Sequence, residues 1–170
     1  MDDETEEVDL LELLKECAQT VCKRYRVDPA VVSVQGEPCV VQNRRVDLMV
    51  VFRNLIDNAV KYAGNPPEVQ IVSTASEDQV QVQICDNGRG VPKKERNRIF
   101  GRFVRLGLEL ERDKPGTGLG LSIVRTLVRR MRGRITVSDR EDGPGTTFAV
   151  AFPKALPTRA AKARLQESTA

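Results

Sequence analysis

The 170-residue chain contains no histidine and no tryptophan, and it has only two tyrosines and five phenylalanines. Without an imidazole, the chain cannot by itself complete a reaction that needs a histidine base or nucleophile. The scarcity of aromatic rings disfavours single-stranded nucleic-acid binding, because such proteins stack bases on aromatic side chains. The net charge of +3 fits an ordinary solvated surface better than a nucleic-acid interface. We therefore expect no nucleic-acid partner.

The sequence also lacks a membrane segment and a zinc motif. No apolar run approaches the about 20 residues of a membrane span, and no signal peptide opens the chain. The cysteines form no C-x-x-C pair and have no histidine to complete a zinc site. We expect four free thiols in a reducing, cytoplasmic compartment. They are Cys17, Cys22, Cys39 and Cys85.

Apolar spacing predicts long helices and paired strands within one domain, residues 8–155. The expected helices lie in residues 8–25, 44–62 and 116–133. The expected strands include short ones at 31–35 and 38–42, a hairpin turning at Glu77-Asp78, and a last hairpin from 134–140 and 146–152. This pattern predicts an α+β fold, a two-layer α/β sandwich with helices on one face of a mixed, mainly antiparallel sheet of about five strands.

The remaining segments have charged, weakly periodic sequences. Residues 1–7 are predicted to form an acidic, frayed tip, and residues 156–170 a basic flexible tail. Residues 91–115 are predicted to form a long loop.

RNLIDNAVKY, residues 53–62, has a helical pattern although asparagine is a modest helix former. At about 100° per residue, Asn54, Asn58 and Lys61 share a stripe opposite the apolar residues. Taken alone, this stripe is explained better as a solvated surface. However, amide oxygens can also join a magnesium shell, and an ammonium group can meet phosphate oxygens.

Two glycine-containing segments follow. DNGRG, residues 86–90, ends a strand, and its carboxylate can accept a hydrogen bond from an exocyclic amine such as adenine's. Taken alone, this segment is explained better as an ordinary turn. GTGLGL, residues 116–121, enters a helix whose first amides suit an anion, although a flexible hinge is an equal alternative. It is not a P-loop, because no Gly-Lys-Ser/Thr follows.

The order of these segments is more specific than any one of them. NLIDNAVKY, DNGRG, IFGRF and GTGLGLSIV resemble the N box, first glycine box, F box and second glycine box of the ATP-binding domain of sensor histidine kinases, in the GHKL (Bergerat-fold) superfamily. The GTTF sequence of the last strand also resembles the end of this family's domain. The resemblance covers roughly residues 8–153.

The resemblance implies ATP and Mg²⁺ as cofactors. By resemblance, Asn58 would ligate Mg²⁺, Asn54 would line the same site, and Lys61 would contact phosphate. Arg105 and Lys114 match positions where the family places phosphate-contacting cations. The implied catalytic residues are Asn54, Lys61 and Arg105.

The resemblance also implies the adenine contacts. Tyr62 would stack on the base, and Asp86 would hold its amino group, with Thr146 supporting it through water. Gly88 and Gly90 would let the base lie against the backbone. The other implied nucleotide contacts are Val91, Gly116, Thr117, Gly118, Leu119, Gly120 and Leu121.

Residues 92–115 would form an ATP lid pinned by Phe100 and Phe103. The implied reaction is phosphoryl transfer, which depends on positioning and charge neutralisation. Because the chain has no histidine, the acceptor would lie on a histidine-containing dimerisation domain of the same full-length protein or of a separate one. A response regulator would act downstream, and the isolated domain is expected to be monomeric.

Two alternatives use the same fold. One is an ATPase like gyrase or a mismatch-repair clamp, or a serine kinase like the anti-sigma factors. Their N boxes begin with a glutamate, whereas this position is Asn54, which cannot act as a base. The other alternative is a non-catalytic nucleotide-sensing module.

Overall fold

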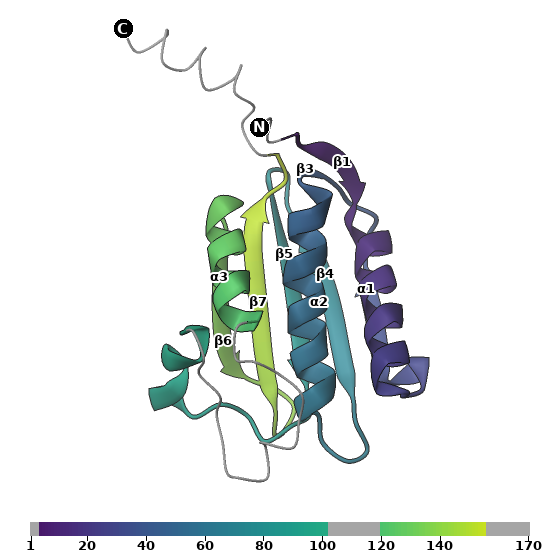
Figure 1. The fold of residues 1–170 in the computed structure, drawn as a ribbon, viewed down its shortest axis with the longest axis vertical. Helices are drawn as coiled ribbons and strands as arrows, with labels where there is room; N and C mark the ends of the chain where they lie inside the picture. The colour runs from purple at the N-terminus through teal and green to yellow at the C-terminus, as the bar shows by residue number, and fades with distance from the viewer. Residues whose placement is uncertain (1–3, 102–119, 156–170) are drawn as a thin grey trace, which may run out of the picture.

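The computed structural model describes residues 4–101 and 120–155 (Figure 1). Helices cover one face of a five-stranded sheet with the order β2-β4-β5-β7-β6. The β2–β4 pairing is parallel and the other three pairings are antiparallel. The strands are β2 (Val32–Gly36), β4 (Val69–Ala75), β5 (Gln79–Asp86), β6 (Arg134–Asp139) and β7 (Thr146–Pro153). The predicted α+β sandwich is confirmed.

The helices are α1 (Leu10–Tyr25), α2 (Arg45–Tyr62) and α3 (Gly120–Arg130). Each is amphipathic and buries one stripe against the sheet or a neighbouring helix. The apolar spacing predicted for the first helix is confirmed, because the residues that form it are all buried: Leu10, Leu13, Leu14, Cys17, Ala18, Val21 and Cys22. Within the described ranges, no helix combines the length and apolar character needed to cross a membrane.

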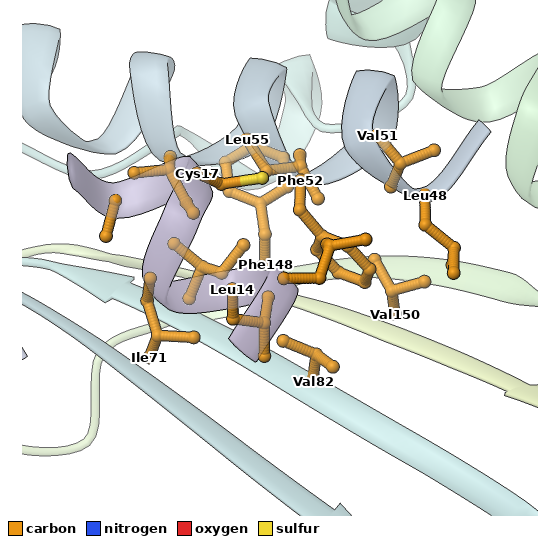
Figure 2. Packing of buried hydrophobic residues seen from close by; sticks show 14 of the residues in the cluster. Leu14, Cys17, Leu48, Val51, Phe52, Leu55, Ile71, Val82, Phe148 and Val150 are labelled. Atoms are coloured by element: carbon orange, nitrogen blue, oxygen red, sulfur yellow. The ribbon is translucent and has the colours of Figure 1, made fainter. Parts of the chain in front are cut away.

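The core lies between the helices and the sheet (Figure 2). Leu14 and Cys17 of α1 meet Phe52 and Leu55 of α2 above the strands. The Phe52 ring also lies 6.4 Å from the Phe152 ring, measured between centroids. This packing fixes α2 on the sheet, and α2 carries the polar stripe on its remaining face.

Two predictions need correction at the edges of the fold. Strand β1 (Glu6–Asp9) pairs antiparallel with β3 (Val40–Asn43) in a separate two-stranded sheet. Glu6 and Glu7 therefore do not belong to a frayed tip, because Val8 is buried and holds this strand in place. The strand expected at 38–42 exists, but it lies in this small sheet rather than in the main one.

The described part of the loop predicted at 91–115 contains two short 3₁₀ helices, η2 (Lys93–Glu95) and η3 (Arg98–Phe100). Ile99 is buried, and Phe100 meets Phe148 of β7 edge to face at 6.4 Å between centroids. The guanidinium carbon of Arg125 in α3 lies over the Phe100 ring, 5.9 Å from its centroid. The beginning of this segment is thus packed on the domain.

Candidate functional site

Asp86 is the last residue of β5 and follows a row of buried apolar side chains. Every second residue of β5 faces the helices, and this row consists of Val80, Val82, Ile84 and Asp86. The last position of the row therefore carries a carboxylate instead of an apolar side chain. The antiparallel register places Asp86 opposite Thr146, which begins the equivalent row of β7. Both residues are buried, with 5% and 4% exposure.

Burial raises the pKa of Asp86. The backbone N–H of Gly88 donates to Oδ1 at 2.8 Å, the backbone N–H of Thr146 also donates to this carboxylate, and Arg140 supplies a nearby positive charge. These groups favour the ionised form but do not outweigh burial. The result is a fixed, poorly solvated acceptor suited to a ligand N–H group.

The turn after Asp86 packs backbone against backbone on the end of α2. A Cβ added at Gly88 would overlap the carbonyl oxygen of Tyr62. A Cβ added at Gly64 would lie 2.5 Å from the carbonyl oxygen of Asn87. The close packing of this turn on α2 therefore requires glycine at position 88. This requirement is separate from the predicted contact of Gly88 with the adenine base. The contact fixes the last turn of α2, with Lys61 and Tyr62, beside the end of β5.

Asn54, the first member of the polar stripe of α2, lies next to Gly120 at the described N-terminal end of α3. The Asn54 Nδ2 group donates to the carbonyl of Val50 at 2.7 Å. Its amide oxygen faces α3, because a Cβ added at Gly120 would lie 3.0 Å from Asn54 Oδ1. Asn58 and Lys61 are half-buried on the same stripe. Asn54 of α2 and Gly120, the described end of the glycine-rich segment, thus lie close together.

Lys61 and Tyr62 lie together in the last turn of α2. The Lys61 ammonium is 5.1 Å from the centroid of the Tyr62 ring. Both side chains are half-buried. The contact holds a cation and an aromatic face side by side at the end of the stripe.

The start of the predicted lid is attached to the sheet. Gly90 has a φ of +82°, in the region that favours glycine. The half-buried Val91 packs on the core and accepts a hydrogen bond from Arg96 Nε at 3.2 Å. Arg96 also pairs with Asp139 of β6 at 2.6 Å. The described start of this segment is thus held against β6 and the core.

Several predicted site residues lie outside the described residues. They are Phe103, Arg105, Lys114, Gly116, Thr117, Gly118 and Leu119. The described Leu121 is half-buried against the core. The roles assigned to all site residues remain predictions.

Asn87 is a positioning residue that the sequence did not single out. Its Oδ1 accepts from the backbone N–H groups of Gly64 at 2.8 Å and Glu68 at 3.0 Å. Its Nδ2 donates to the carbonyl of Pro66 at 2.8 Å. One side chain therefore holds the whole connection between α2 and β4 against the turn after Asp86. Asparagine in an Asp-Asn-Gly run signals only a turn, so this role depended on the tertiary fold.

The Asn87→Ala variant is expected to lower the free energy of unfolding by about 2–3 kcal/mol, because it leaves two N–H donors and one carbonyl without their partner. Denaturant unfolding of this variant and of Asn97→Ala, an exposed asparagine, measures the difference. Equal stability of the two variants would contradict the assigned role.

The described residues thus place a buried acceptor at the end of β5, beside the polar stripe of α2 and the described N-terminal end of α3. Residues 43–156 match the family described as histidine kinase-, DNA gyrase B-, and HSP90-like ATPases. This match covers more than half of the chain, and the chain belongs to this family.

Similar proteins within the family are sensor kinases. The signal transduction histidine-protein kinase ArlS of Staphylococcus haemolyticus is 37% identical over 105 residues, which cover 62% of this chain and 22% of ArlS. The sensor histidine kinase RcsC of Escherichia coli is 36% identical over 128 residues, covering 75% of this chain and 12% of RcsC. The chain thus spans less than a third of the length of these curated relatives.

Solved structures extend the likeness to the fold. The mycobacterial sensor histidine kinase MprB superposes with a TM-score of 0.75 at 28% identity, covering 89% of this chain and 98% of that one. Full-length ShkA in complex with AMPPNP gives a TM-score of 0.72 at 26% identity, covering 90% and 32%. The predicted resemblance to the ATP-binding domain of sensor histidine kinases is confirmed.

Proposed function

We propose that this chain is the ATP-binding catalytic domain of a two-component sensor histidine kinase. It would donate the γ-phosphoryl group of ATP to a histidine on a separate dimerisation domain, with a response regulator downstream. The observation that carries the proposal is Asn54, whose Nδ2 is bonded to Val50 and whose amide oxygen faces the start of α3. An amide fixed in this way cannot activate water, so the nucleotide is held for an outside acceptor.

The donor set supports Mg²⁺ as the cofactor. Asn54 and Asn58 offer neutral amide oxygens, which suit a hard cation already shared with phosphate oxygens. Asn58 would hold the ion and Asn54 would line the same site. When bound, the ion would neutralise charge on the phosphates. Lys61 supplies a further cation one helical turn on, and the adenine would be oriented by Asp86 and Thr146.

The Asn58→Ala variant is expected to remove most of the gain in ADP affinity that Mg²⁺ confers, because one amide ligand is lost. Affinity without Mg²⁺ should change little, since the adenine contacts remain. Titrations with and without Mg²⁺ measure the gain, with Gln81→Ala, an exposed residue of β5, as the matched control. An undiminished Mg²⁺ effect would remove Asn58 from the metal site.

The phosphotransfer itself is tested by mixing the chain with a histidine-bearing dimerisation domain and γ-labelled ATP. We expect label on that domain, in an acid-labile and alkali-stable bond typical of phosphohistidine. A variant acceptor lacking its histidine is the control. An alkali-labile, acid-stable product would instead identify a serine kinase. Steady phosphate release without an acceptor would identify an ATPase, and nucleotide binding with no transfer would favour a sensing module.

A further inference from the structure

Glu68 and Arg140 form an ion pair across the end of β5. Glu68 precedes β4 and Arg140 follows β6, 72 positions later, and their closest atoms are Oε1 and Nη2 at 2.7 Å. The Arg140 side chain is 16% exposed and that of Glu68 is 52% exposed. The pair thus joins the two loops that flank the strand end carrying Asp86.

The backbones of Glu68 and Arg140 are also hydrogen-bonded to the residues next to Asp86 and Thr146. The Glu68 N–H donates to Asn87 Oδ1 at 3.0 Å, and the Glu68 carbonyl accepts from the Asn87 N–H at 3.2 Å. The Arg140 N–H donates to the Gly145 carbonyl at 3.1 Å. Asn87 directly follows Asp86, and Gly145 directly precedes Thr146.

Gly145 closes the connection. A Cβ added there would overlap the carbonyl oxygen of Asp86 and would lie 3.1 Å from Cδ of Arg140. The contacts therefore run from Asp86 to Asn87, through the Glu68–Arg140 pair, to Gly145 and back to Asp86. A closed set of contacts restrains its members more than an open chain of the same bonds.

We propose that the Glu68–Arg140 ion pair positions Asp86 and Thr146 for recognition of the adenine amino group, with Arg140 as the positioning residue. This inference rests on the proposed ATP-binding function. Arg140 acts through Asp86 in two ways: it holds the loop that leads into Thr146, and it places a positive charge near the carboxylate.

The positive charge of Arg140 changes the pKa of Asp86, and the direction of this change can be measured. Arg140 lowers the pKa of Asp86, against the larger effect of burial, and the N–H groups of Gly88 and Thr146 act in the same sense as Arg140. The guanidinium of Arg140 makes this contribution through its positive charge. Removing it raises the pKa of Asp86 further, so the carboxylate becomes protonated at a higher pH. A protonated carboxyl is a weaker acceptor for an amine.

The test is an ADP titration between pH 5 and pH 8 with wild type and the variants Arg140→Gln, Arg140→Lys and Glu68→Gln. We expect Arg140→Gln and Glu68→Gln each to weaken binding about fivefold at neutral pH. The pH at which binding falls should move upward in Arg140→Gln, but not in Glu68→Gln, which keeps the guanidinium. Arg140→Lys keeps the charge and should restore the wild-type pH profile.

Arg45→Gln is the matched control, because Arg45 forms a pair of the same length, 2.7 Å, with Glu16 on α1, away from the site. It should bind ADP as wild type does. The inference is overturned if Arg140→Gln keeps the wild-type affinity and pH profile, or if Arg45→Gln weakens ADP binding equally. In either case wild-type ADP binding leaves the proposed function intact. Absence of ADP binding by wild type would overturn both.

Discussion

Replacing Asp86 with asparagine is expected to weaken ATP and ADP binding by about 100-fold. The amide oxygen can still accept the Gly88 N–H, which bonds Asp86 Oδ1 at 2.8 Å in wild type. The other carboxylate oxygen is replaced by an NH₂ group, which is a hydrogen-bond donor and would face the amino group of adenine, also a donor. A buried unmatched pair of this kind loses the hydrogen bond and retains the cost of desolvation. Calorimetric titration of the purified variant measures the loss.

The same variant should not lose stability at neutral pH. Because burial raises the pKa of Asp86, the folded protein holds this proton more tightly than the unfolded chain does. This carboxyl therefore favours folding in acid, and that contribution falls as the pH rises from about 4 through the raised pKa. The melting temperature of Asp86→Asn relative to wild type should rise over this range. Unchanged nucleotide affinity would refute the adenine assignment, and a destabilised variant at neutral pH would refute the account of burial.

The Gly88→Ala variant is expected to lose about 3 kcal/mol of unfolding free energy and with it most nucleotide binding. The added methyl group would overlap the Tyr62 carbonyl oxygen, which is backbone and cannot rotate away. Relief requires the end of α2 to separate from the turn after Asp86. Lys61 and Tyr62 would move with it. Denaturant unfolding and ADP titration measure the two losses.

Gly143→Ala separates this clash from the general cost of replacing glycine. Gly143 has a φ of +100°, and apart from its chain neighbours no atom of the described residues lies within 4 Å of an added Cβ. Only backbone strain is expected there, of about 1–2 kcal/mol, with ADP binding retained. If both variants bind ADP like wild type, the close approach at Gly88 does not support the site.

The parts of the site that follow from periodicity could be predicted from sequence. The alternation of β5 and β7 places Asp86 and Thr146 on the core face, and the helical period gathers Asn54, Asn58 and Lys61 on one stripe. These features depend on residues close together in the chain. The order of the boxes then indicated the family.

The supporting contacts could not be predicted in this way. Asn87 bonds residues 19 to 23 positions away, and Glu68 pairs with Arg140 across 72 positions. Neither carries a periodic signal, because polar residues in loops are compatible with many partners. The β1–β3 pairing was missed for a related reason, since acidic residues at a chain end resemble a solvated tip.

The central claim is that the buried Asp86 carboxylate selects adenine for a triphosphate held beside α2. Calorimetric titration of the wild-type chain with ATP and with GTP, both with Mg²⁺, tests it most directly. The account predicts saturable binding of one ATP and much weaker binding of GTP, because guanine presents an oxygen where adenine presents its amino group. Absence of ATP binding at millimolar concentration, or equal affinity for GTP, would contradict it.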